Sequence, residues 1–262
     1  MEHRALAHFK RALDKFHRGE VKDGLVDLEQ AIQLDPARWE FFWTRGAFNY
    51  RRRAYPAALS DLTQAIDLCS DVEQAAKIYQ QRMFCYGRLE DYERVVKDAT
   101  WLIEHGFIEP NIYQWRGWSK YIMGNLEGAI EDYSRVLELT LDPYGNRLNR
   151  VMLYYKSHRY DEALEDLDQA LKFALRELET ERTLAFVVYQ CRALVLYQRG
   201  DIEKSFYEYN YGQVLVGFKP YVSMESYVAT IKDLVHSFSG IPSRPSDRAF
   251  LTRRGTPQES II

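Results

Sequence analysis

The sequence contains only three cysteines, Cys69, Cys85 and Cys191, and their spacing matches no metal-binding motif. Their odd number, together with an N-terminus (MEHRALAHFKRALDKF) that lacks the apolar core of a signal peptide, predicts reduced thiols in the cytosol. No apolar run approaches the ~18 residues that a membrane-spanning helix needs. We therefore expect a cytoplasmic protein that does not bind membranes.

A strong excess of either charge is also missing. The 262 residues include 35 Lys and Arg against 38 Asp and Glu, a formal net charge of −3, which gives no general attraction for nucleic acids or anionic lipids. The six histidines are scattered, and none forms a metal-ligand pair with a nearby cysteine. The motifs GxGxxG, GxxxxGK(S/T), GxSxG and HExxH do not occur. We expect no enzymatic activity, no cofactor and no metal site.

What the sequence does contain is a repeat, seen most clearly in residues 110–143. This stretch reads as two amphipathic helices separated near Gly124 and Asn125. In the second helix Ala129, Asp132 and Val136 share one face, at spacings of three and seven residues. The same pattern can be placed over the chain five more times, at a period of about 34 residues.

One arginine per unit fixes the register of the repeat. Small residues follow most of these arginines after 1, 13 and 20 positions, where two helices would cross closely. Two units carry short insertions, and we interpret the second, residues 178–185, as an extension of the flanking helices because it contains no Gly or Pro. The arginines, which we call the ladder arginines, are Arg11, Arg45, Arg82, Arg116, Arg150 and Arg192.

In this register the sequence resembles the tetratricopeptide repeat family over residues 5–219. The resemblance implies an all-α, right-handed α-solenoid of six helix pairs, at about 5–38, 39–72, 76–109, 110–143, 144–177 and 186–219. An amphipathic segment at 221–239 is predicted to cap the exposed end of the last unit, as helical arrays require. These segments form one array, 1–239, and we expect 240–262, rich in Pro, Ser, Gly and Arg, to be a flexible tail.

An acid lies sixteen residues after every ladder arginine. It falls on the same face of the second helix as the small residues, so it can meet an arginine inside the array. We interpret the column as structural Arg–carboxylate pairs, for which the planar guanidinium is well suited. The alternative is a row of arginines that bind a ligand. The acids are Asp27, Asp61, Asp98, Asp132, Asp166 and Glu208.

The family resemblance implies that the first helix of each unit lines an inner, concave groove. Aromatic residues there could anchor a peptide, and neighbouring cations could select acidic groups. The alternative is that several of these rings pack between adjacent first helices. The candidate groove residues are Trp43, Tyr50, Arg51, Phe84, Arg88, Trp118, Tyr121, Tyr155 and Lys156.

These features favour a non-catalytic adaptor or scaffold whose groove holds a peptide or helix of a partner protein, with acidic groups and aromatic or leucine anchors. Some family members grip the C-terminal carboxylate of chaperones with Lys and Asn, but the corresponding positions here hold Phe9 and Leu13, or Trp43 and Ala47. We therefore do not expect an adaptor of that type. The alternative function is RNA binding, which helical repeats with stacked aromatics can perform; the net charge disfavours it.

Overall fold

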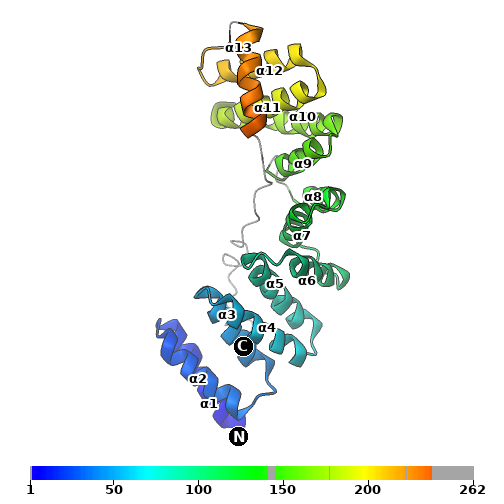
Figure 1. The fold of residues 1–262 in the computed structure, drawn as a ribbon. Helices are drawn as coiled ribbons and strands as arrows, with labels where there is room; N and C mark the ends of the chain where they lie inside the picture. Colours follow the sequence, from blue (N-terminus) through cyan, green and yellow to red (C-terminus); the bar gives the residue numbers. More distant parts are fainter. Residues whose placement is uncertain (1, 141–144, 177, 222, 238–262) are drawn as a thin grey trace. The chain divides into compact units, whose positions relative to one another are not determined.

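A computed structural model describes residues 2–140, 145–176, 178–221 and 223–237 of the chain (Figure 1). Within these residues all regular secondary structure is α-helical, in thirteen helices. The all-α solenoid fold predicted from the repeat is thus confirmed. The predicted tail, 240–262, lies outside the described residues.

The first twelve helices form pairs that follow the predicted register closely. The two helices expected in 110–143 are α7 and α8, and the turn between them contains Gly124 and Asn125 as predicted. The helices are α1 (Glu2–His17), α2 (Val21–Leu34), α3 (Trp39–Arg51), α4 (Tyr55–Leu68), α5 (Val72–Arg88), α6 (Tyr92–Glu104), α7 (Pro110–Ile122), α8 (Leu126–Leu139), α9 (Gly145–Lys156), α10 (Tyr160–Arg176), α11 (Leu178–Arg199) and α12 (Ile202–Leu215).

The insertion before the sixth unit lengthens two helices, as the lack of Gly and Pro predicted. Helix α10 extends to Arg176, and α11 already begins at Leu178. At 17 and 22 residues, these helices exceed the 12 to 14 residues of α8, α9 and α12. The extra residues therefore enlarge helical surface in the C-terminal half of the chain.

Every helix pair turns at the same repeat position, eight residues after the ladder arginine, and the residue there always has a positive φ. Three units place glycine at this point, with φ between 78° and 95°. The other three place a residue with a Cβ atom in the same left-handed conformation, which is sterically unfavourable for it. These are Arg53 (φ 62°), Glu90 (φ 61°) and His158 (φ 58°).

Contacts between the helices divide the chain into two compact bodies. The N-terminal body runs to Ser119, and the C-terminal body begins at Lys120 and continues through α13 (Met224–Ser237). The core of the N-terminal body is built around fully buried side chains such as Phe41, Ile78 and Leu102, and that of the C-terminal body around Tyr133 and Leu153. Each body thus has its own apolar interior.

The segment after the sixth unit forms the predicted capping helix, α13. Its Tyr227 and Ile231 are fully buried against Leu194 of α11 and Tyr209 of α12. The Tyr227 hydroxyl also forms a hydrogen bond with the buried Ser205 hydroxyl of α12. Helix α13 therefore covers apolar surface that would otherwise be exposed at the last repeat.

Candidate binding surface

The ladder arginines of the first, second, third, fifth and sixth repeats bind the acids of their own units. In the third unit Arg82 Nε lies 2.9 Å from Asp98 Oδ2, and Arg82 Nη2 lies 2.8 Å from Asp98 Oδ1. In the fifth, the same two nitrogens of Arg150 lie 2.7 and 2.6 Å from the Asp166 oxygens. The further pairs are Arg11–Asp27, Arg45–Asp61 and Arg192–Glu208. The structural interpretation of this column is confirmed for these units.

Each ladder arginine from the second unit onward also reaches back to the preceding unit. Its Nη1 contacts the residue eighteen positions after the preceding ladder arginine, on the previous second helix. In the interior this residue is a hydroxyl: Arg82 Nη1 lies 3.3 Å from Thr63 Oγ1, and Arg150 Nη1 lies 2.8 Å from Ser134 Oγ. The full set of back-contacts is Arg45–Glu29, Arg82–Thr63, Arg116–Thr100, Arg150–Ser134 and Arg192–Asp168. The guanidinium therefore links consecutive helix pairs and is not available as a row of ligand donors.

In the first and fourth units, a lysine four positions after the ladder arginine also contacts the acid. Lys15 Nζ lies 2.8 Å from Asp27 Oδ2, and Lys120 Nζ lies 2.9 Å from Asp132 Oδ2. The Arg11 guanidinium, with help from Lys15 and His8, holds the pKa of the Asp27 carboxyl well below its usual range. The Asp27 carboxylate is thus an ionised structural group, which fixes the register of the two helices in its unit.

The candidate groove residues fall into two classes of exposure. Four rings are buried, with at most 7% of their surface exposed: Trp43, Tyr50, Phe84 and Trp118. Tyr121, Tyr155 and Lys156 are half-buried, and Arg51 and Arg88 are exposed. Arg51 and Arg88 are therefore more accessible to solvent than the four buried rings.

The buried rings are held by neighbours within the array. Trp43 Nε1 donates a hydrogen bond to Oε1 of Gln81, a side chain of α5 that is itself 1% exposed, at 2.9 Å. The Trp118 ring meets Tyr92 edge-on, with 5.1 Å between ring centroids. These contacts place Trp43 between adjacent first helices, as in that alternative, and Trp118 against the second helix α6. Trp43 and Trp118 are therefore packed into the array and do not project from it as anchors for a ligand.

Two cations of the set, Arg51 and Lys156, lie beside aromatic rings. The Arg51 guanidinium carbon lies 5.4 Å from the centroid of Phe48, and Lys156 Nζ lies 5.8 Å from that of Tyr121. Such contacts pre-order the long side chains at modest energetic gain. The charged groups that a partner would meet are therefore partly fixed in position.

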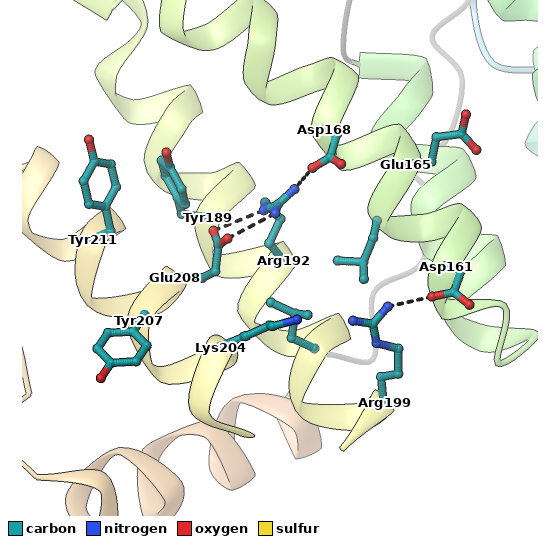
Figure 2. Close-up of a pocket in the computed structure, with 12 residues that line it drawn as sticks. Asp161, Glu165, Asp168, Tyr189, Arg192, Arg199, Lys204, Tyr207, Glu208 and Tyr211 are labelled. Atoms are coloured by element: carbon teal, nitrogen blue, oxygen red, sulfur yellow. Dashed lines mark hydrogen bonds and ion pairs between the residues drawn. The ribbon is translucent and has the colours of Figure 1, made fainter. Parts of the chain in front are cut away.

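A cleft with a volume of about 680 Å³ lies in the C-terminal body, between α10, α11 and α12. Figure 2 shows Arg192 at its centre, bound on one side by Asp168 and on the other by Glu208. Arg199 pairs with Asp161 at 2.6 Å nearer the end of α11. Tyr207 and Tyr211 of α12 line the same cleft. It lies on the side of the second helices, and the sequence reasoning, which concentrated on first helices, missed it.

Among the described residues no cluster of three or more His, Cys, Asp or Glu is placed to hold a metal ion. Burial raises the pKa of the Cys85 thiol to about 12, so this cysteine stays protonated at neutral pH. None of the described helices is long and apolar enough to cross a membrane.

Three structural partners were not identified from the sequence: the back-contact column, Gln81 and Trp115. The first could have been found, because a hydroxyl or acid recurs eighteen residues after each of the first five ladder arginines. Gln81 and Trp115 each occur at their repeat position in one unit only, so the pattern does not reveal their roles. The structure shows that Gln81 binds Trp43 and that Trp115 fills the core of the third unit. Trp115 is fully buried beside Phe84, with 5.7 Å between ring centroids.

Comparison with known sequences agrees with the repeat. A family model described as a tetratricopeptide repeat matches residues 110–143. Tetratricopeptide repeat protein 13 of Homo sapiens is 28% identical over 139 residues, which are 53% of this chain and 16% of that protein. The Hsp70-Hsp90 organizing protein of Triticum aestivum is 26% identical over 196 residues, 69% of this chain and 32% of that protein. The chain thus spans about a sixth to a third of the length of these relatives.

Solved structures show the same fold. A tetratricopeptide repeat protein from Parabacteroides merdae superposes with a TM-score of 0.58 at 17% identity, covering 89% of this chain and 88% of that one. YrrB, described as a tetratricopeptide repeat protein with an unusual peptide-binding site, gives 0.59 at 13% identity, covering 78% and 97%. The paired helices, their arginine–acid ladder and these matches agree: the described residues have the tetratricopeptide repeat fold, and residues 110–143 match the sequence model of that family.

Proposed function

We propose that this protein is a non-catalytic scaffold that binds a segment of a partner protein on the face formed by its first helices. The similarity to tetratricopeptide repeat proteins supports a role in protein–protein interaction: one protein similar in sequence is named for chaperone organisation, and one structure with the same fold is described by its peptide-binding site. The observation that carries the proposal is the pair Arg51 and Arg88. They are exposed, they occupy the same repeat position in consecutive units, and each ends its first helix.

The partner that fits this face is an extended or helical segment with acidic groups and aromatic or leucine side chains. In the N-terminal body Arg51 and Arg88 would pair with its carboxylates, above a wall made by Trp43, Tyr50, Phe84 and Trp118. In the C-terminal body Lys156 would do the same beside Tyr121 and Tyr155. The chaperone clamp is not part of this proposal, because Phe9 and Trp43 are apolar and buried at the corresponding positions. As a further part of this proposal, we expect the protein to act in the cytoplasm.

The test compares full-length variants in binding to acidic peptides that carry leucine or phenylalanine, measured by fluorescence anisotropy. Arg51→Glu with Arg88→Glu should weaken binding about tenfold, and the effect should shrink as salt rises, because the contacts are solvent-exposed. Lys22→Glu makes a matched charge reversal at an exposed site on a second helix, and it should bind like the parent. Because Trp43 and Trp118 are buried, their replacement would report on folding as well as binding, so the exposed cations are the sharper probes.

Equal affinity of the double variant and the parent would remove the first-helix face from consideration. Affinity for single-stranded RNA that falls steeply with salt, while no acidic peptide binds, would instead favour the nucleic-acid function. The two functions thus separate on the ligand bound and on the salt dependence.

A further inference from the structure

The outward face of α12 differs from that of every preceding second helix. Its exposed residues Tyr207, Tyr211, Val214 and Phe218 follow one another at helical spacing and are 62%, 55%, 56% and 59% exposed. We call these four residues the α12 stripe. Phe218 lies just beyond the end of the helix, beside Phe186 of α11 at 6.1 Å between ring centroids.

The repeat register shows that this apolar face is specific to the sixth unit. The first three stripe positions lie 15, 19 and 22 residues after the ladder arginine Arg192. In the other five units the equivalent positions hold polar or charged residues, with two exceptions. One is Val26, which stands alone, and the other is Trp101, which is half-buried and stacks on Tyr79 at 3.9 Å. A soluble repeat normally keeps this face polar, so a continuous apolar stripe indicates a surface that becomes covered.

The cleft beside the stripe determines what kind of group would cover it. Its lining combines the rings of Tyr189, Tyr207 and Tyr211 with four carboxylates and three cations, as Figure 2 shows. The carboxylates of Asp161 and Asp168 are 83% and 53% exposed although each contacts an arginine. Tyrosine faces and exposed carboxylates together suit an arginine side chain, which stacks on the first and pairs with the second. The complementary ligand is therefore a segment with both arginine and apolar residues.

The chain itself contains such a segment directly after α13. Residues 240–262 hold four arginines against one Asp and one Glu, and Ala249, Phe250 and Leu251 are followed closely by Arg253 and Arg254. Eleven residues lie between Ser237, the end of α13, and Ala249. A chain of that length can span about 40 Å, whereas α12 is roughly 21 Å long. Helix α13 packs on α11 and α12, so the segment begins at the body that carries the stripe.

We propose that residues 249–254 dock on the α12 stripe of their own chain, with Phe250 and Leu251 against its apolar side chains and Arg253 and Arg254 beside the exposed carboxylates of Asp161 and Asp168 in the neighbouring cleft. The last repeat would thus carry an intramolecular ligand on its second helices. This surface is separate from the first-helix face proposed above, and the inference does not depend on that function.

Limited trypsin digestion of the full-length protein tests the docking, since the protease cleaves after Arg253 and Arg254. In the parent, docking should slow this cleavage. Tyr207→Ser with Tyr211→Ser should accelerate it about tenfold, because proteolysis follows the population of the undocked segment. Phe250→Ser with Leu251→Ser should accelerate the cleavage to the same extent, because it removes the apolar side chains of the docking segment. The matched control is Val26→Ser, which removes an equally exposed side chain, 62%, from the equivalent position of the first unit; its cleavage rate should equal that of the parent.

All stripe substitutions are at exposed positions, and an unchanged thermal melt will verify that each variant remains folded. Identical cleavage rates in the parent and in both double variants would overturn the proposal. Protection that rises with protein concentration would also overturn it, because the occupant would then be the segment of a second copy. Protection that is independent of concentration and lost in both double variants supports docking within one chain.

Discussion

The ring of Trp115 occupies the space where residue 87 would otherwise have a side chain. A Cβ atom added to Gly87 would lie 2.4 Å from Cζ3 of Trp115, far inside van der Waals contact. In the other five units the position equivalent to Gly87 holds a phenylalanine or tyrosine. Trp115, fully buried on α7, replaces that ring from the following first helix.

This relationship predicts that Gly87→Ala is destabilising although alanine favours helices. The tryptophan must shift within a packed core, which typically costs about 1–3 kcal/mol of unfolding free energy. Urea denaturation followed by circular dichroism measures the loss. Adding Trp115→Leu to Gly87→Ala should cost less than the sum of the two single changes, because the smaller side chain relieves the contact. Strict additivity of the two substitutions would contradict the steric explanation.

The residue with a positive φ in each turn predicts that a substitution by glycine stabilises the protein, in contrast to Gly87→Ala. Glu90 has φ 61° and is exposed, so Glu90→Gly should remove backbone strain and raise the unfolding free energy by about 0.5–1 kcal/mol, after the greater entropy of unfolded glycine is subtracted. Gly124→Ala makes the reverse change at the same repeat position and should lower stability by about 1 kcal/mol. A Cβ atom at Gly124 would have no neighbour within 4 Å, so conformation alone is tested. A gain in Tm for Gly124→Ala would refute this reading.

The ladder predicts a large cost when one partner of a buried pair is removed. The side chains of Arg82 and Asp98 are 14% and 4% exposed, so Asp98→Ala leaves a guanidinium without its carboxylate inside the array and should cost about 3–5 kcal/mol. The control is Glu138→Ala, which breaks a pair with Arg135 whose side chains are 58% and 49% exposed, and which should cost less than about 1 kcal/mol. Thermal melts of the two variants give the comparison. Similar small losses in both would show that the ladder does not stabilise the array.

The depressed pKa of Asp27 predicts how one ladder pair responds to pH. A carboxyl whose folded pKa lies below its unfolded value of about 4 contributes stability above that pH and loses it as the pH falls. The stability difference between the parent and Asp27→Asn should therefore be greatest near neutral pH and shrink progressively below about pH 4. Asp23→Asn, at an exposed site on the same helix outside the ladder, is the matched control. Parallel stability curves for the parent and Asp27→Asn would contradict the ion-pair assignment.

The sequence by itself determined the repeat, the helix pairs and one side of the ladder. These features recur every 34 residues or so, and recurrence separates a structural requirement from chance: small residues at the crossings, an arginine and an acid sixteen positions apart, and a break after each first helix. The extension of α10 and α11 also followed, because an insertion without Gly or Pro continues the helices beside it.

Only the tertiary structure decided which aromatic side chains are buried between helices and which are exposed to solvent. The first-helix positions of Trp43, Phe84 and Trp118 look alike in the sequence, but their exposure depends on Gln81, Trp115 and Tyr92, which come from other helices. Conversely, the spacing of Tyr207 and Tyr211 is that of an ordinary amphipathic helix. Only the structure shows that none of the described helices covers their face. The repeat in the sequence predicts the contacts that all units share. The burial of a particular side chain also depends on contacts that only one unit makes, which the repeat does not predict.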